Sequence, residues 1–323
     1  MKRINYYRRI YSAYLTGNKS HLTFWYDVPE VNENFEPGRL GEYYMPFFAK
    51  ANYSGYYDNK GIPMLDYRGI VGLQYNPIAI AQYGLGNYNL YYRTKEEERK
   101  SKFLNVANWL ANNLEETSYG TKVWNHHFDW EYRDILKAPW YSALAQGQGI
   151  SVLVRAHKET GNDEYMNAAM NAFHAFNKDI KEGGVTYTDN NNYLWFEEAI
   201  VDPPTHILNG FIWATWGIYD YFLHTGAREA GQLFDKAVRT LKDNLSQFDA
   251  GFWSLYEQSG TRMKMLASPF YHSLHIVQLN VMNKLTNESV FKDFAGKWDN
   301  YRQSALKRTV AIIYKSLFKL LNY

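Results

Sequence analysis

Apolar residues recur at helical spacing along most of the chain, and one arrangement of them is repeated four times. In each repeat an apolar run reaches a threonine and a polar turn, and a second amphipathic run follows. The threonines are Thr94, Thr160, Thr225 and Thr286, which lie 66, 65 and 61 residues apart. Such a repeat indicates a unit that cannot bury its own apolar face and therefore packs on its neighbours. The pattern predicts a series of helical hairpins.

The apolar spacing also gives the expected bounds of the helices. We expect helix pairs over 77–92 and 94–114, 142–157 and 163–176, 207–224 and 228–245, and 273–285 and 289–301. Thr94 and Glu97 have the form of a capping box, and Gly161 is placed to end the helix before it. Hairpins that alternate inner and outer helices suggest an (α/α) toroid, so the predicted fold is mainly α.

The chain before the first hairpin has a different pattern. Seven aromatic residues between Tyr43 and Tyr57 precede a turn at 58–61, and apolar residues follow it. This predicts a small β-hairpin outside the helical domain, either a lid over a groove or an oligomer contact. We expect an N-terminal basic segment and hairpin over 1–72, the (α/α) barrel with the catalytic site over 73–303, and a basic amphipathic helix over 304–323.

The expected C-terminal helix has two distinct faces. The apolar face holds Leu306, Val310, Ile313, Leu317 and Leu321, and the basic face holds Arg308, Lys315 and Lys319. Such a helix docks on its own domain or on a second subunit, or it lies on a membrane surface. The pattern leaves both readings open.

Composition and charge narrow the class of protein. Of the 323 residues 18% are aromatic, which suits a groove that stacks on sugar rings and equally suits broad helix interfaces. The absence of cysteine excludes disulfides and thiolate chemistry, and a net charge of +2 argues against nucleic-acid binding. No apolar run is long enough for a membrane span, and the first residues are too polar for a signal-peptide core. We therefore expect a cytoplasmic protein, with peripheral contact at the inner membrane left open.

Polar and aromatic side chains cluster before the second, third and fourth hairpins. The inter-hairpin loops of a toroid collect at one end, where loop residues commonly carry function. His126 and His127 lack a third ligand at metal spacing, so no metal site is predicted. The clusters contain Trp124, His126, His127, Asp129, Trp130, Glu131 and Trp140; Trp195, Phe196, Glu197, Glu198, Asp202 and His206; and Tyr256, Arg262, Lys264, Tyr271, His272 and His275.

Four segments carry a resemblance to a known family. The chain resembles, in order over about residues 70–303, the C-terminal catalytic domain of the D-glucuronyl C5-epimerases, which convert glucuronate to iduronate in heparosan-type chains. The resemblance implies an (α/α) barrel, a β-rich region before it, a homodimer and a cleft for an anionic, uronate-containing polysaccharide. It requires no cofactor and leaves a divalent cation open. The matching segments are NPIAIAQYGLGNY (76–88), WYSALAQGQGISVLVRA (140–156), WFEEAIVDPPTHILNGF (195–211) and FYHSLHIVQL (270–279).

The same resemblance identifies candidate site residues. Glu198, Tyr256 and Tyr271 match the family's functional positions and are expected to be catalytic. Inverting C5 removes a proton beside a carboxylate and returns one to the opposite face, so two acid/base groups and a carboxylate-neutralising cation are needed. Nearby cations such as Arg262 and Lys264 would lower the pKa of a phenol. The expected substrate-binding residues are Trp140, Tyr141, Gln146, Gln148, Arg155, Trp195, Glu197, His206, Asn209, Arg262, Lys264, His272 and His275.

One position departs from the family pattern. The family has a tyrosine after the paired glutamates and then a proline, whereas this chain has Ala199 and Ile200. Glu198 is the natural substitute for that phenol. Three alternatives stay open: a polysaccharide lyase that shares the first proton abstraction, a glycoside hydrolase that pairs Glu198 with Asp202 or Glu131, and a non-catalytic glycan-binding protein.

Overall fold

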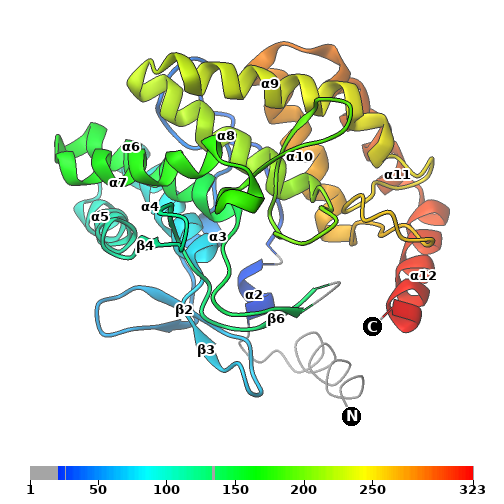
Figure 1. Cartoon of the computed structure of the whole chain (residues 1–323), viewed down its shortest axis with the longest axis horizontal. Coiled ribbons are helices and arrows are strands. Elements are labelled where there is room, and N and C mark those ends of the chain that lie inside the picture. The colour runs from blue at the N-terminus through cyan, green and yellow to red at the C-terminus, as the bar shows by residue number, and fades with distance from the viewer. Residues whose placement is uncertain (1–20, 26, 133–134, 323) are drawn as a thin grey trace.

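The computed structural model describes residues 21–25, 27–132 and 135–322, with side chains up to residue 318 (Figure 1). Its main part is four helical hairpins, as predicted, and the inner helices pack in chain order: α4 on α6, α6 on α8, and α8 on α10. The predicted (α/α) fold class is therefore confirmed. The hairpins are α4 (Pro77–Thr94) with α5 (Glu97–Asn112), α6 (Ala143–Thr160) with α7 (Asp163–Phe173), α8 (Leu208–Thr225) with α9 (Arg228–Asn244), and α10 (Pro269–Thr286) with α11 (Ser289–Gln303).

Each repeated threonine is the last residue of an inner helix. The Thr160 hydroxyl donates to the Ala156 carbonyl at 2.7 Å and accepts from the Asn162 N–H at 3.2 Å, while Gly161 between them has a φ of 70°. The other three hairpins repeat these bonds. The threonine thus ends one helix and shapes the turn to the next.

The expected capping box at Thr94 and Glu97 is wrong. The residue that caps the start of α5 is Glu96, and its side chain makes no capping hydrogen bond. The Thr94 hydroxyl is already bonded to the Leu90 carbonyl at the end of α4. The repeated sequence therefore marks the ends of the inner helices.

Glycines allow α6 and α8 to pack closely. A Cβ on Gly217 would lie 2.1 Å from the carbonyl oxygen of Gly147, so a side chain there would force the two backbones apart. A Cβ on Gly149 would lie 2.3 Å from the Trp124 ring. In the predicted motif at 140–156, Gly147 therefore serves the contact between two helices, and Gly149 makes room for Trp124.

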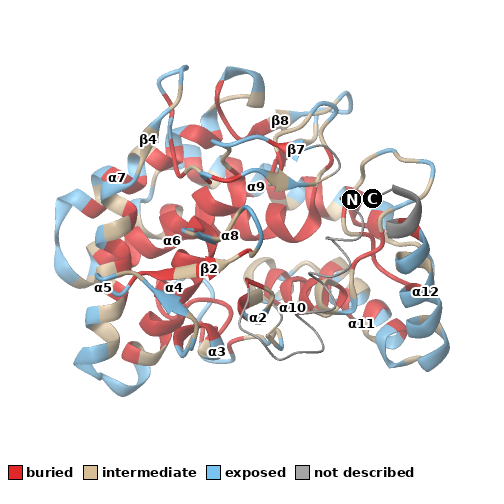
Figure 2. Cartoon of the chain, turned by 90° about the horizontal axis from the view of Figure 1, so that it is seen from below, coloured by how far each residue is buried: buried red, intermediate tan, exposed pale blue. Residues whose placement is uncertain are grey.

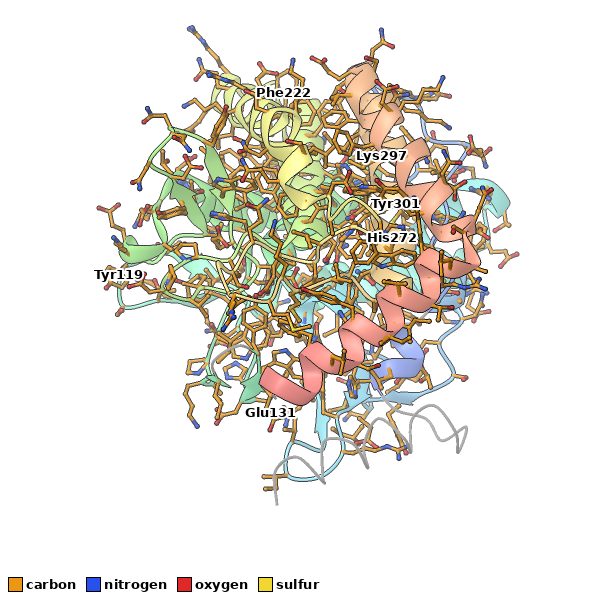
Figure 3. The ribbon with its side chains drawn as sticks, turned by 90° about the vertical axis from the view of Figure 1, so that its right-hand side faces the viewer. Tyr119, Glu131, Phe222, His272, Lys297 and Tyr301 are labelled. Carbon is orange, nitrogen blue, oxygen red and sulfur yellow. The ribbon has the colours of Figure 1, made fainter. Side chains whose placement is uncertain are left out.

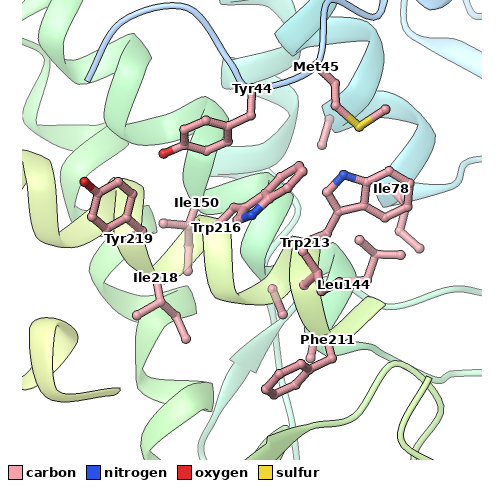
Figure 4. Close-up of a cluster of buried hydrophobic side chains, with 14 of the residues drawn as sticks. Tyr44, Met45, Ile78, Leu144, Ile150, Phe211, Trp213, Trp216, Ile218 and Tyr219 are labelled. Atoms are coloured by element: carbon pink, nitrogen blue, oxygen red, sulfur yellow. The ribbon is translucent and has the colours of Figure 1, made fainter. Parts of the chain in front are cut away.

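One N-terminal segment, the strap (residues 33–44), contacts all four inner helices near their C-terminal ends. It covers this end of the barrel, and Figure 4 shows Tyr44 of the strap beside Trp216 of α8 in the buried apolar cluster, with ring centroids 5.2 Å apart. The contacts are the Lys284–Glu33 ion pair on α10, the Gly38 N–H to the Tyr219 hydroxyl on α8, the Arg155 Nε to the Gly41 carbonyl on α6, and the Tyr43 N–H to the Asn89 Oδ1 on α4.

The strands are short and lie in the connections. The predicted hairpin is present, with its turn at 58–61 between the first two strands, but Tyr43, Tyr44 and Phe47 pack in the same core as the helices. The sequence predicted that these aromatic residues lie outside the helical domain, and that prediction is wrong. The strands are β1 (Tyr56–Tyr57), β2 (Pro63–Asp66) and β3 (Leu73–Gln74) in one antiparallel sheet, and the pairs β4 (Glu115–Glu116) with β5 (Lys122–Val123), β6 (Trp130–Glu131) with β7 (Ile135–Leu136), and β8 (Thr186–Thr188) with β9 (Leu194–Phe196).

The remaining helices flank the barrel. The predicted C-terminal helix is present as α12, and Figure 3 shows it crossing the face of the molecule from beside Tyr301. Within the described residues no helix is long and apolar enough to cross a membrane. These helices are α2 (His21–Trp25), α3 (Phe48–Ala51) and α12 (Ala305–Asn322), and three short 3₁₀ turns are η1 (His174–Asn177), η2 (Ile180–Glu182) and η3 (Leu245–Phe248).

Helix α12 docks on its own domain, and not through the apolar face predicted for it. Ala311 and Phe318 are buried, and Lys315 Nζ donates to the Leu266 carbonyl at 2.6 Å. The predicted face is 42% to 75% exposed at Leu306, Val310, Ile313 and Leu317, whereas the Leu321 side chain and the basic residues 1–20 lie outside the described part (Figure 2).

Candidate active site

A cavity of about 410 Å³ opens among the N-terminal ends of the inner helices, opposite the end that the strap covers. The inter-hairpin loops and the N-terminal segment complete its wall. The predicted gathering of the loops at one end of the toroid agrees with this position. Four of its lining residues, Met45, Ile78, Leu144 and Trp213, lie close together in the buried apolar cluster of Figure 4. The helices contribute Asn76, Ile78 and Gln82 at α4, Leu144 of α6, Asn209 and Trp213 of α8, and Phe270, Tyr271 and Leu274 of α10.

Glu198 lies in this wall, in the loop after β9. Its Oε2 accepts a hydrogen bond from Asn209 Nδ2 at 3.3 Å, and Gly210 makes room for the side chain because a Cβ there would lie 2.1 Å from Oε2. The surrounding protein shields the carboxyl from water and raises the pKa of Glu198 to about 8; the nearby Glu257 carboxylate adds to this rise and Asn209 opposes it. Such a group can hold or release a proton near neutral pH.

Two phenols face the same cavity. Tyr271 stands in the first turn of α10, and its ring centroid lies 4.9 Å from that of Tyr256, which comes from the preceding loop. Burial, and then the charge of Glu198, raise the pKa of Tyr256 well above 10. The expected lowering of this pKa by nearby cations is therefore wrong, because Arg262 and Lys264 lie exposed on the loop and do not line the cavity. At neutral pH Tyr256 is an uncharged proton donor.

Glu197, beside Glu198 in sequence, points elsewhere. It is fully buried and accepts two hydrogen bonds from His206, from the backbone N–H at 3.1 Å and from the ring Nδ1 at 2.5 Å. Trp195 stacks on the same histidine ring with centroids 4.2 Å apart. Neighbouring residues of extended chain point to opposite sides, so these three predicted binding residues form a separate structural group outside the cavity wall.

Arg155 and the two glutamines of its helix also lie in the core. Arg155 forms a buried ion pair with Asp220 at 2.6 Å, on the side of the barrel that the strap covers. Gln146 accepts from the Trp124 N–H, and Gln148 accepts from Gln82 Nε2. Resemblance alone does not separate such structural residues from ligand-binding ones, and none of the three lines the cavity.

The remaining predicted residues divide in the same way. His272 and His275 are buried and both contact the Ser254 hydroxyl, and Tyr141 borders a separate, smaller hollow. Trp140 does line the cavity, with its ring stacked 3.8 Å from that of His126. The structure thus brings together Glu198, Tyr256, Tyr271, Trp140 and Asn209, and places the other eleven candidates outside the cavity wall.

Sequence reasoning missed the part of the wall that comes from the N-terminal segment. The segment assigned to a separate hairpin supplies His21, Trp25 and Lys50 directly to the cavity. Its high aromatic content was the available signal, but no periodicity linked it to the barrel. In the described parts of the chain, no three His, Asp or Glu side chains are grouped to hold a metal ion.

Comparison with known proteins identifies relatives over this region. The model of the family described as D-glucuronyl C5-epimerase C-terminus matches residues 116–300. A D-glucuronyl C5-epimerase of Caenorhabditis elegans is 29% identical over 222 residues, which are 64% of this chain and 36% of that protein. An uncharacterized protein of Methanocaldococcus jannaschii is 27% identical over 75% of this chain and 83% of its own length. The matched part thus spans about a third of the nematode epimerase.

Solved structures share the fold at low sequence identity. Cellobiose 2-epimerases from Spirochaeta thermophila and Bacillus thermoamylovorans superpose with TM-scores of 0.51 and 0.52, each at 13% identity. The first comparison covers 79% of this chain and 65% of that one, and the second covers 83% and 66%. At this identity the likeness shows the helical barrel and nothing further.

Proposed function

Because the chain belongs to the D-glucuronyl C5-epimerase family, whose model matches more than half of it, we propose that it inverts C5 of glucuronate residues in a heparosan-like polysaccharide. The observation that carries the proposal is the placement of Glu198, with a pKa of about 8, on the same cavity as two phenols. Such a set can supply the two acid/base groups that inversion requires.

The proposed reaction has two proton transfers. Glu198 in its carboxylate form takes the proton from C5, and the electron pair of the broken C–H bond spreads into the sugar carboxylate. Tyr271 then donates its phenolic proton to C5 from the opposite face, which inverts the centre. Before the next turnover Glu198 releases its proton to solvent, and the Tyr271 phenolate takes a proton from solvent. Tyr256 contacts the Tyr271 ring and positions it.

The cavity also suits a sugar ring. Trp130 and Trp140 line it, and the apolar face of a pyranose can stack on aromatic rings of this kind. Lyases share the first step but then expel the C4 substituent, so the products distinguish the two reactions. The homodimer expected from the family stays a prediction.

The test is incubation of the protein with heparosan in deuterated water, followed by NMR and ultraviolet absorbance. We expect deuterium at C5 and iduronate signals, with intact chains and no absorbance from unsaturated uronate. Unsaturated product would establish a lyase instead, and the absence of any exchange would contradict the proposal.

Tyr271→Phe tests the second acid/base group in the same assay. Loss of the hydroxyl should lower C5 exchange by roughly 100-fold or more, because general acid–base groups contribute on that order. The ring remains to pack against Tyr256, so the thermal unfolding midpoint should stay close to that of the wild type. Near-normal exchange in this variant would remove Tyr271 from the mechanism.

A further inference from the structure

Lys50 is distinctive among the residues that line the cavity. It lies in the short helix α3, a few residues after the strap, at a position outside the matched family region. Among the lysine and arginine residues of the described chain, it is the one that contributes to the cavity wall. The cations expected from the sequence, Arg155, Arg262 and Lys264, do not line it.

The surroundings of Lys50 hold its ammonium group in place without neutralising it. The side chain is 6% exposed, and Nζ donates a 2.7 Å hydrogen bond to the Phe24 carbonyl. Aromatic rings surround it, with the centroids of Phe24, Trp25 and Phe47 at 4.5, 5.6 and 5.8 Å from Nζ. An ammonium has three N–H donors, so this arrangement leaves donors for another acceptor.

No carboxylate lies within ion-pair distance of Lys50 in the described residues, whereas the other deeply buried cation, Arg155, is matched by Asp220. A buried charge without a counter-ion is costly, and burial lowers the pKa of Lys50 to about 7, with Asp27 opposing the change at longer range. An anion placed in the cavity would relieve this cost. Lys50 is therefore placed to form an ion pair with an anion that binds in the cavity.

We propose that Lys50 binds the carboxylate of a uronate residue in the cavity and is the cation by which the site selects uronates over neutral sugars. The carboxylate would accept a charge-assisted hydrogen bond from Nζ while the sugar lies between Lys50 and the rings of the wall. If the chain is a C5-epimerase, the same contact stabilises the charge that moves onto the carboxylate as C5 loses its proton. This second role rests on the proposed function, whereas carboxylate recognition does not.

The test compares binding of a heparosan oligosaccharide with binding of its carboxyl-reduced counterpart, in which each glucuronate is a glucose. Calorimetry on the wild type should show a preference for the carboxylate form, and Lys50→Met should lose roughly 10- to 100-fold of that preference, as expected for one charged hydrogen bond. Lys50→Arg, which keeps the charge, should retain part of it. Lys284→Met is the matched control, because this lysine contacts the strap at the covered end, and it should bind as the wild type does.

The outcomes separate this inference from the proposed reaction. A wild type that binds both oligosaccharides equally, or neither, overturns the role of Lys50, and so does a Lys50→Met variant that keeps the full preference. If Lys50→Met loses the preference while the wild type shows no C5 exchange in deuterated water, the carboxylate site stands and the epimerase proposal fails. Thermal unfolding of both Lys50 variants checks that they fold.

Discussion

The two ends of the barrel are made from the same four inner helices, yet they differ in whether their buried charges are paired. At the end covered by the strap, charges are matched: Arg155 pairs with Asp220, which also accepts from the Tyr44 hydroxyl at 2.6 Å. At the cavity end, Glu198 meets an amide and no cation of the described residues, and Lys50 meets a carbonyl and aromatic rings. Removing one partner of a buried ion pair destabilises a fold, whereas an unmatched buried charge already costs stability and is available to a ligand.

The largest effect is expected from breaking the matched end. Arg155→Met leaves Asp220 buried without its counter-ion, and such a loss typically destabilises a protein by about 3–5 kcal/mol. Urea unfolding should show it as a lower midpoint with little change in slope. Lys50→Met removes a cation that pairs with no carboxylate of the described residues, so it should cost much less. Equal losses in the two variants would contradict the distinction between the ends.

Two glycines of α8 sharpen the comparison at single positions. Gly217→Ala places a methyl group against the backbone of Gly147, so α6 and α8 must separate, and overpacking of this kind costs about 1–3 kcal/mol. Gly210→Ala meets the carboxyl group of Glu198 and also its Cβ, at 2.7 Å, so the loop that carries Glu198 must shift as well. We therefore expect a smaller loss of stability at Gly210 than at Gly217, where two helix backbones meet, but a fall in C5 exchange of roughly tenfold or more, because the base is displaced. Full exchange in Gly210→Ala would show that this glycine does not position Glu198.

The last expected effect is the pH dependence that Glu198 adds to stability. Its pKa is raised from 4.5 to about 8, so between these values the folded state holds a proton that the unfolded state releases. Stability from this group is complete below the lower value and is lost as the pH rises towards the higher one. Glu198→Gln should therefore gain stability relative to the wild type between pH 5 and pH 8. Denaturation curves of both proteins at pH 5 and pH 8 test this. If the stability difference between Glu198→Gln and the wild type is the same at both pH values, the pKa is not raised.

The sequence predicted the barrel well because its evidence is periodic. Apolar spacing and the threonine repeat located the eight hairpin helices to within a few residues, and the loops indicated the end at which Glu198, Tyr256 and Tyr271 meet. Charged residues have no comparable periodicity, so the sequence does not distinguish a core cation such as Arg155 from a cavity cation such as Lys50.

Sequence patterns also did not predict the strap or its contacts. Its hydrogen bonds and ion pair join residues 33–44 to helices as distant as α10, and each depends on a single side chain or backbone group. The neighbouring Glu197 and Glu198 differ for a similar reason. Only the path of the chain after β9 turns one carboxylate to His206 and the other to the cavity.

These two glutamates give the most direct test of the account. C5 exchange on heparosan in deuterated water should be measured for Glu198→Gln and Glu197→Gln beside the wild type, under identical conditions. Glu198→Gln should lose exchange by at least roughly 100-fold, as expected for a general base, while Glu197→Gln should keep most of it because its contacts are structural. A Glu198→Gln variant that exchanges normally, or a greater loss in Glu197→Gln, would contradict the assignment of Glu198 as the base.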